Sequence, residues 1–502
     1  MREPDTPYQL VASASQWDRL MHHLAAPDAE RMAFGYCTAS RSARGVRLLL
    51  RDVALPGDHE YATQHSAGVV LDAVGTIPYL LRAKGAAALL DAHSHPWSEV
   101  PHPSRTDDAA APPQYRSLQA VAPGGALLRI VLTRQGEIWA GILTSETRRE
   151  TILQEVRVHG PEGVRIIHPV NTPAPTCPAV RAIDSRNLAM LGAANLARVR
   201  RLHIAVIGLG GVGSMVARLT AGLAARLILI DPDRLEPSNA PRLWYAGAAS
   251  RGPKVVAAKR ALERAFPDLT VTARVAAFPS PETTSLVQEA DAVFACPDHN
   301  AVRVSASRLA ADGMLPLIEV GCGGRREGGS LSALGYHVRL QIPDGPCLVC
   351  SGLDTSRLED PESTREKRSL GYVDNAGEVA GELGCLTTRA AADAVDVLLR
   401  YWTGYAGPPP LHLYVDALRF KTLDLSRAFA SREDCPVCGA SSGRWPNKTE
   451  VVILRPLAGS RTRGREGRVS CYTGPESAFP DPSGGNRAPA GIAKRTPRTR
   501  CD

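Results

Sequence analysis

The chain has 502 residues, which is more than one ordinary domain holds, so two or three domains are expected. Its hydrophobic content of 44% is that of a globular protein, and the sequence contains no run of about 18 uncharged apolar residues that would span a bilayer. The first residues are polar and do not form the apolar core of a signal peptide. A cytoplasmic protein without a membrane partner is therefore expected.

The net charge of +8 is concentrated at the C-terminal end of the chain. Residues 440–502 carry twelve Lys and Arg against five Asp and Glu, a net charge of +7. Pro, Gly, Ser and Arg are frequent in this stretch, and such a composition does not bury enough apolar surface to fold. We predict a disordered basic tail over residues 441–502, whose charge is solvated and does not indicate a nucleic-acid partner.

Residues 1–150 alternate strand-like runs with one helix-like stretch, over residues 66–84, which predicts a compact α/β domain. The strand-like runs cover residues 47–55, 87–92 and 126–133. The following residues, 151–180, contain Pro, Thr and Gly and include Pro173-Ala-Pro175. We predict that they form a linker between two domains.

Two histidines in this first domain have the spacing of metal ligands. His93 and His95 are separated by one residue at the end of a predicted strand, so their side chains point the same way and reach one ion. Asp107, a dozen residues later, supplies a third ligand and leaves a fourth position for water. Zinc lowers the pKa of such a water to about 7, which is the basis of hydrolysis at neutral pH.

The series His93-Ser-His95-Pro followed by Ser104-x-x-Asp107 resembles the JAMM (JAB/MPN) metalloprotease family, whose members cleave bonds at the C-terminus of ubiquitin and similar proteins. The resemblance implies a JAB/MPN-like α/β fold for residues 1–150. It also implies His93, His95 and Asp107 as ligands of a catalytic Zn²⁺, Ser104 as a group that holds the oxyanion, and Glu30 as the general acid and base. Eleven residues separate His95 from Asp107, one more than in the family pattern, so Asp108 is an alternative ligand.

The second half of the chain has the pattern of a doubly wound parallel sheet, because short apolar strands alternate with helical lengths. The predicted domain spans residues 181–440. Its predicted helix covers residues 181–200, and its predicted strands cover residues 203–207, 227–230, 292–295 and 316–320.

A glycine-rich loop follows the first of these strands. Gly208, Gly210, Gly211 and Gly213 fit the dinucleotide-binding pattern, and Asp231 ends the next strand, where a ribose acceptor is expected. This loop by itself predicts a domain that holds NAD or FAD. A redox or binding module is therefore one alternative.

The residues around the loop resemble a different family. Four segments resemble the landmarks of the ThiF/MoeB/HesA family, which includes the ubiquitin-activating enzymes. In chain order they are Asp-Ser-Arg186-Asn, the segment from Asp231 to Arg242, Gly-Pro-Lys254 and Cys-x-Asp298-His-Asn. The resemblance implies a Rossmann-like domain that adenylates a carboxylate with ATP and Mg²⁺. The phosphates would be bound by Asn239, Arg242 and Lys254, the Mg²⁺ by Asp298, and the ATP of a partner subunit by Arg186, so a homodimer is implied.

The cysteines divide into paired and single residues. Two Cys-x-x-Cys pairs bring four thiolates to one ion, which predicts a structural Zn²⁺ site formed by Cys347, Cys350, Cys435 and Cys438. By the family resemblance, Cys385 is a candidate nucleophile for a thioester, since it precedes a predicted helix whose N-terminus favours a thiolate. A packing role for Cys385, or Cys322 as the nucleophile, is the alternative.

Together these resemblances predict ATP-dependent activation of the C-terminal Gly of a ubiquitin-like protein that ends in Gly-Gly, fused to a zinc peptidase or isopeptidase acting on the same protein. A conjugating enzyme would be a further partner. The alternative within the same chemistry is activation of a sulfur-carrier protein, in which a thiocarboxylate forms and the JAMM-type half releases a product.

Overall fold

The structure is a computed structural model, and it describes residues 7–26, 29–65, 68–71, 73–144, 150–173, 181–247, 249–327, 329–353, 355 and 383–439. All of the described residues lie in one compact unit, Met1–Leu454. The predicted basic tail, residues 441–502, lies outside the described residues. No described helix is both long enough and apolar enough to cross a membrane.

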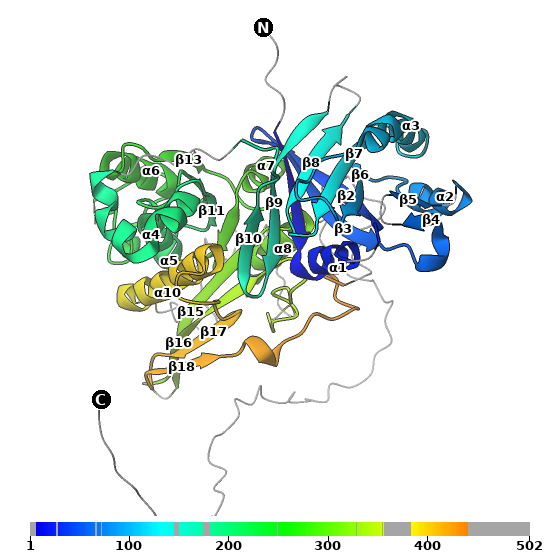
Figure 1. Ribbon diagram of the computed structural model, residues 1–502. Coiled ribbons are helices and arrows are strands. Elements are labelled where there is room, and N and C mark those ends of the chain that lie inside the picture. The colour runs from blue at the N-terminus through cyan, green and yellow to red at the C-terminus, as the bar shows by residue number, and fades with distance from the viewer. Residues whose placement is uncertain are drawn as a thin grey trace, which may run out of the picture. The chain divides into compact units, whose positions relative to one another are not determined.

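The N-terminal half is built on a mixed sheet (Figure 1). Its strands are β1 (Tyr8–Ser13), β2 (Met32–Ser42), β3 (Gly45–Ala54), β6 (Ala88–His95), β7 (Ala126–Thr133), β8 (Ile138–Leu143), β9 (Thr151–Gly160) and β10 (Gly163–Ile167). They are ordered β1-β3-β2-β6-β7-β8-β9-β10, and β1 also pairs in parallel with β9. A separate hairpin contains β4 (Tyr61–His65) and β5 (Gly68–Leu71).

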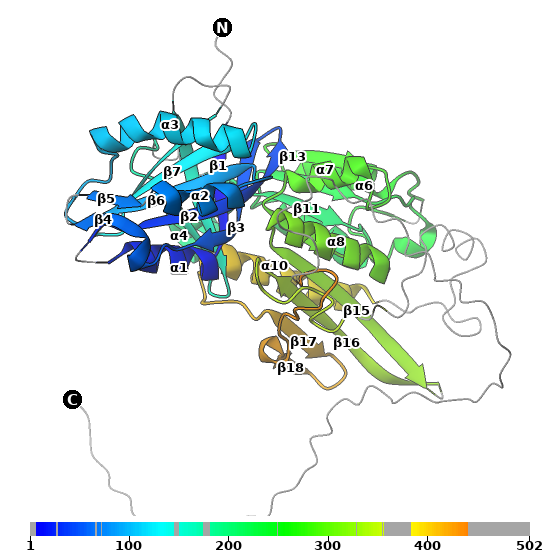
Figure 2. The same ribbon diagram turned by 90° about the vertical axis from the view of Figure 1, so that its right-hand side faces the viewer.

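Helices cover both faces of this sheet (Figure 2). The first helix, α1 (Ala14–Leu24), buries Trp17, Leu20 and Leu24, which recur at helical spacing on one face. On the opposite face, α3 (Arg105–Val121) buries Leu118 against strand residues such as Leu127. The short α2 (Ala73–Arg82) also belongs to this half.

Residues 151–167 form two strands and not the linker that the sequence predicted. In β9, Leu153, Val156 and Val158 are fully buried in the N-terminal core, and β10 pairs with β9 along its whole length. The prediction weighed Pro and Gly in the stretch as a whole and missed this apolar run. The N-terminal sheet therefore extends to Ile167.

The second half is built on another mixed sheet, ordered β13-β12-β11-β14-β15-β16-β17-β18. Its strands are β11 (His203–Ile207), β12 (Arg226–Ile230), β13 (Thr270–Arg274), β14 (Ala292–Ala295), β15 (Leu317–Glu327), β16 (Ser330–Gln341), β17 (His412–Asp416) and β18 (Lys421–Asp424). The first five in this order pair in parallel, and the others are antiparallel. The predicted parallel strands thus form the doubly wound part.

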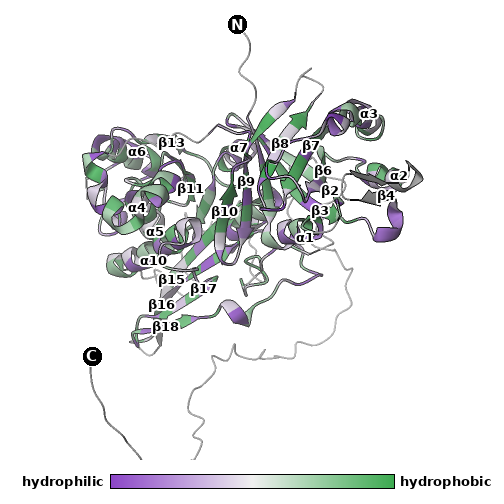
Figure 3. Ribbon diagram, viewed as in Figure 1, coloured by the Kyte–Doolittle hydropathy of each residue, from purple (hydrophilic) through white to green (hydrophobic). Residues whose placement is uncertain are grey.

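Alternate residues of the buried strand β11 belong to two cores. Ile204 and Val206 pack with α5 (Gly211–Thr220), α6 (Lys254–Ala265) and α10 (Gly384–Thr403). Ala205 and Ile207 pack with α7 (Pro281–Gln288) and α8 (Asn300–Gly313). The strands are accordingly apolar along their length, as Figure 3 shows, whereas the covering helices also carry hydrophilic residues.

The chain reverses its direction of travel across this sheet at β11. From β11 it moves outward to β12 and β13, and it then returns to β14 on the other side of β11. In open α/β sheets, ligands bind at the carboxyl ends of the strands beside such a switch point. The loops that follow β11 and β14 are therefore where a ligand site is expected.

Candidate functional site

Two histidines and one carboxylate converge at the end of β6. His93 and His95 lie on the same face of the strand, and Asp107 lies in the first turn of α3. The Nε2 atoms of the two histidines are 3.4 Å and 3.5 Å from Asp107 Oδ2. One ligand atom from each of the three residues lies within 4.8 Å of the others, so the three can hold one metal ion.

The start of α3 fixes the position of Asp107. Ser104 caps the helix: its Oγ accepts a hydrogen bond from Asp107 N, and Asp107 Oδ2 accepts one from Ser104 N at 2.6 Å. Burial opposes ionisation of Asp107, but the neighbouring imidazoles of His93 and His95 outweigh it and hold its pKa well below the usual range. Asp108, the alternative ligand, is exposed and pairs instead with Arg129.

Glu30 lies beside this cluster because the chain enters β2 next to the end of β6. The backbone N–H of Arg31 donates to Ser94 Oγ, and Ser94 N donates to the carbonyl of Arg31, each at 3.0 Å. Burial lowers the pKa of His93, but Asp107, Asp91 and Glu30 together raise it above its usual value. The Nε2 atom of His93 is buried without a hydrogen bond among the described residues, which fits a metal ligand.

Asp91 is a residue of this site that the sequence analysis missed. It lies two residues before His93, on the same face of β6, and Gln114 donates a 2.6 Å hydrogen bond to its Oδ2. Its Oδ1 is buried without a hydrogen bond among the described residues, and burial raises its pKa. The alternation Asp-x-His-x-His was the available signal. Carboxylates in this position orient metal-binding histidines.

The four paired cysteines form a second cluster in the other half of the chain. The Sγ atoms of Cys347 and Cys435 are 3.5 Å apart, and those of Cys350 and Cys438 are 3.4 Å apart. All four Sγ atoms lie within 4.8 Å of one another, and Cys347 and Cys435 are fully buried. Such a set of four thiols fits a closed tetrahedral zinc site. None of the four is available as a nucleophile when the ion is bound.

The glycine loop packs tightly against the segment that follows β14. A Cβ on Gly208 would lie only 2.8 Å from the carbonyl oxygen of Cys296, so there is no room for a side chain. Gly208 also has φ +86°, a conformation that favours glycine. A Cβ on Gly213 would lie 1.9 Å from the carbonyl oxygen of Gly208. A Cβ on Gly210 would meet nothing within 4 Å, so the loop opens to space at the N-terminus of α5. Gly211 begins that helix.

Asp231 holds this loop in place. One oxygen of its buried carboxylate accepts a 2.6 Å hydrogen bond from Leu209 N, and the other accepts one of 2.7 Å from Asp233 N. Burial is the largest influence on the Asp231 carboxyl and raises its pKa. Asp231, which the sequence predicted as a ribose ligand, thus holds the glycine loop in its conformation.

The predicted phosphate-binding residues lie in the segment after β12. Lys254 begins α6, and its Nζ donates a 2.8 Å hydrogen bond to Asp233 Oδ2. Asn239 caps a short turn by accepting from Glu236 N. Arg242 lies two residues before Trp244, whose indole N–H donates to Ser214 O at 2.8 Å. This segment is therefore tied to α5, the helix that follows the loop.

The predicted Mg²⁺ ligand, Asp298, is exposed on the loop that follows β14. Arg303 fixes that loop, because its guanidinium donates two hydrogen bonds to Pro297 O and pairs with Glu319 at 2.8 Å. Burial opposes ionisation of Glu319, but Arg303 and His337 lower its pKa to about 2. The sequence analysis missed Glu319, because its partners are separated from it along the chain. Arg186 is exposed near the start of α4 (Ser185–Val199).

Cys385 is exposed and is the second residue of α10. The neighbouring Gly384 contacts the Arg242 segment: a Cβ on Gly384 would lie 3.0 Å from Pro241 O. Cys322, the alternative, is half-buried in the middle of β15, and burial raises its pKa. Of the two thiols, Cys385 is the accessible one, and it lies at the edge of the predicted nucleotide site.

The comparisons with known proteins agree with the geometry of the second half. Residues 184–437, slightly more than half of the chain, match the ThiF family. The chain belongs to the ThiF family. The predicted ThiF-type domain is thus confirmed, and the JAMM-type domain of the N-terminal half stays a prediction.

Several relatives match the ThiF region. The chain is 27% identical over 258 residues to the vegetative HesA protein of Trichormus variabilis, covering 51% of this chain and 87% of that protein. It is 29% identical over 242 residues to the molybdopterin-synthase adenylyltransferase of Escherichia coli, covering 47% and 87%. A crystal structure of E. coli MccB with ATP aligns with a TM-score of 0.42 at 19% identity, covering 52% of this chain and 75% of that one.

Proposed function

We propose that this chain uses ATP to adenylate the C-terminal glycine of a ubiquitin-like or sulfur-carrier protein, and that its N-terminal half is a zinc-dependent peptidase acting on the same C-terminus. The observation that carries the first part is the open glycine loop at the switch point of the sheet, with Arg242, Lys254 and Asp298 on the segments around it. Membership of the ThiF family and the named activity of its E. coli relative support it.

Adenylation joins the carboxylate of the carrier to the α-phosphate of ATP and expels pyrophosphate. The reaction brings a carboxylate against a polyanion, so positive charge along the phosphates is the main requirement. Backbone N–H groups at the start of α5 and the cations of Arg242 and Lys254 supply it. Asp298 would hold Mg²⁺, which would supply further positive charge to the phosphates of ATP. Asp231 keeps the loop in shape for the nucleotide.

A thioester is the second step that the geometry allows. The thiolate of Cys385 would attack the carbonyl carbon of the acyl adenylate, forming the C–S bond and releasing AMP. The contact between Gly384 and Pro241 places this thiol beside the Arg242 segment, where the adenylate would form. If the carrier serves sulfur transfer, the adenylate goes instead to an external sulfur donor, and Cys385 is dispensable.

The peptidase half needs a metal, a proton carrier and a group at the oxyanion. His93, His95 and Asp107 would hold the ion, and zinc bound there supplies a Lewis acid at the scissile carbonyl. Glu30, whose charge already acts on His93, would take a proton from the attacking water and give it to the leaving amine. Ser104 would donate to the oxyanion while its backbone holds Asp107.

ATP–pyrophosphate exchange tests the adenylation proposal. Purified chain is mixed with labelled pyrophosphate, ATP and carrier proteins that end in Gly-Gly. Exchange should require the carrier and should be lost when its last Gly is removed. Lys254→Ala should lower the exchange rate by roughly 10²-fold, because a buried cation at the phosphates is lost.

Lys259→Ala is the matched control, since Lys259 lies further along α6, is half-exposed and pairs with Glu263. It should exchange at the wild-type rate. Absence of exchange with every carrier, together with tight binding of NAD, would replace the adenylation proposal by a redox or binding module. A reducible adduct that forms with wild type and not with Cys385→Ser would assign conjugation, and equal product formation by both would assign sulfur transfer.

A further inference from the structure

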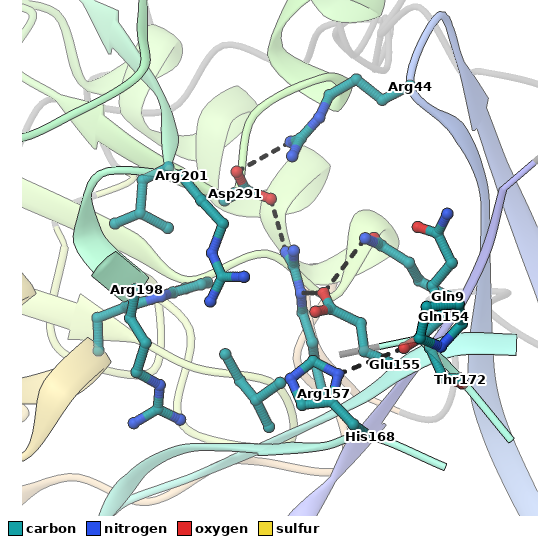
Figure 4. Close-up of a pocket in the computed structure, with 14 residues that line it drawn as sticks. Gln9, Arg44, Gln154, Glu155, Arg157, His168, Thr172, Arg198, Arg201 and Asp291 are labelled. Carbon is teal, nitrogen blue, oxygen red and sulfur yellow. Dashed lines mark hydrogen bonds and ion pairs between the residues drawn. The ribbon is translucent and has the colours of Figure 1, made fainter. Parts of the chain in front are cut away.

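A polar cavity of about 360 Å³ lies where the N-terminal sheet contacts the ThiF region (Figure 4). Its walls come from β1, β9 and β10, from the β2–β3 turn, from the C-terminal end of α4 and from the residue before β14. The side chains that matter are Arg44, Glu155, Arg157, Arg198, Arg201 and Asp291. None of them belongs to the metal or nucleotide residues described above.

Two of the four arginines are neutralised by the two acids. Asp291 is fully buried and accepts from Arg157 at 2.6 Å and from Arg44 at 2.9 Å. Glu155 pairs with the other edge of Arg157 at 2.5 Å. Burial opposes ionisation of Asp291, but Arg157 and Arg44 hold its pKa well below the usual range. This part of the cavity wall is therefore charge-balanced and preformed.

The other two arginines form no ion pair with an acid among the described residues. Arg198 and Arg201 are half-buried at the end of α4. Arg198 donates to a backbone carbonyl, that of Val164, at 3.4 Å, and the Arg201 guanidinium has no hydrogen bond or ion pair among the described residues. Burial lowers the pKa of Arg198 and the charge of Arg201 lowers it further, while the charge of Glu155 acts in the opposite direction. Two like charges thus share one cavity wall and leave it with an excess of positive charge.

This cavity is separate from the nucleotide site. Asp291 precedes β14, and Asp298 follows it, so the cavity adjoins the amino end of the strand and the nucleotide loop adjoins the carboxyl end. The cavity also adjoins the amino end of β11, where Leu202 lines it, and the glycine loop begins at Gly208, just after the carboxyl end of β11. A nucleotide bound at the loop therefore does not occupy the cavity.

We propose that the cavity binds a small, multiply charged phosphoryl anion, such as a pyrophosphate or a phosphate ester, through Arg198 and Arg201. Planar guanidiniums bind phosphoryl oxygens in a bidentate manner, and burial strengthens these hydrogen bonds. His168, at the rim, offers a further donor. Because the walls come from both halves of the chain, the bound anion stabilises their contact. The proposal does not depend on the chemistry of either candidate catalytic site.

Hydrogen exchange of the full chain with and without pyrophosphate tests the proposal, with the nucleotide site saturated by a non-hydrolysable ATP analogue. Pyrophosphate should slow exchange in β9, β10 and the end of α4. Arg201→Gln should weaken binding by at least about tenfold, since a charge-assisted pair of hydrogen bonds is lost, and Arg198→Gln together with Arg201→Gln should abolish it. Arg201→Lys should retain part of the affinity.

Arg116→Gln is the control, because Arg116 is exposed on α3 and lies outside the cavity. It should bind pyrophosphate as the wild type does. Equal binding by wild type and the Arg201→Gln chain would overturn the proposal, as would protection confined to residues 208–213. Citrate serves as a polycarboxylate probe, and tighter protection by citrate than by pyrophosphate would overturn the assignment to a phosphoryl anion.

Discussion

The two clusters of side chains that could hold a metal ion differ in the number of donors and in the elements that support them. In the ThiF region, four thiols from two loops surround one point, and two of them are fully buried. In the N-terminal half, two histidines on a strand and an aspartate at a helix start supply three donors and leave one side open. Four donors complete a tetrahedron and favour a structural ion, whereas three leave room for a reactant.

Under the proposed function, zinc would serve stability in one place and chemistry in the other. The cysteine cluster joins segments 84 residues apart in a part of the chain with little regular structure, so its ion would replace a hydrophobic core. The histidine cluster stands on β6, which the sheet already supports on both sides through β2 and β7. Removing a metal from the two sites should therefore have different consequences.

The largest effect is expected at the cysteine cluster. Cys347→Ser should remove one equivalent of zinc per chain and lower the free energy of unfolding by several kcal/mol, on the order of 3 or more, because metal binding there is folding free energy. Zinc analysis and thermal unfolding measure the two changes. Cys385→Ser, an exposed cysteine outside the cluster, should change neither. Unaltered stability and zinc content in the Cys347→Ser chain would show that the cluster is not a zinc site.

The next effect is expected at Glu30. Glu30→Gln should lower cleavage of a carrier extended beyond its C-terminal glycine by about 10²- to 10⁴-fold, because a general base is lost. Zinc content, thermal stability and pyrophosphate exchange should stay at the wild-type level. The control is His102→Ala, an exposed histidine on the loop before α3. Full cleavage by the Glu30→Gln chain would remove Glu30 from the proposed site.

A smaller effect is expected at Asp91, which lies two residues before His93 on β6. Asp91→Asn should weaken zinc binding at the N-terminal site by about 10- to 100-fold, as loss of a carboxylate that orients a metal-binding histidine does. Competition with a chelator measures the affinity. The fold should remain, since Gln114 can still donate to the amide oxygen. Unchanged zinc affinity would mean that Asp91 does not position His93.

The smallest effect is expected at the contact between the two halves. His159 on β9 is buried, and its Nδ1 lies 3.0 Å from the hydroxyl of Tyr401 on α10. Burial, with the charges of Arg157 and Arg47, lowers its pKa to about 3. Below about pH 6.5, His159 is protonated in the unfolded chain and stays neutral in the folded chain. The free energy of unfolding therefore falls as the pH drops from about 6.5 toward 3.

His159→Gln should lessen this pH dependence, at a cost of about 1 kcal/mol at neutral pH for the altered hydrogen bond. Urea unfolding at pH 7.5 and pH 5.5 gives the slope, and His102→Gln is the exposed control. A slope equal to that of the wild type would show that His159 does not carry the effect. Neither candidate metal cluster includes His159. This variant therefore also tests whether a change at the contact between the two halves leaves metal binding at the clusters unaltered.

The sequence predicted those features that are written in short, local patterns. The glycine loop, the paired cysteines and the His-x-His series each lie within a few residues, and the structure brings each predicted group together. The strands β11 and β14 were predicted at their observed bounds because a buried parallel strand is a continuous apolar run. Residues 151–167 were mistaken for a linker because β9 mixes polar residues into its apolar pattern.

Other features depend on residues that meet only in the folded chain. The cavity beside Asp291 combines β1, β9, the end of α4 and the residue before β14. Asp291 pairs there with two arginines more than 130 positions away along the chain, and the sequence contains no local signal for this. Glu319 meets Arg303 and His337 in the same way. By itself the sequence determined which side chains are candidates for metal and nucleotide binding, because ligand spacing and loop glycines are local constraints. The tertiary structure decided which charges are buried together, because desolvation and Coulomb energy depend on distance in space and not along the chain.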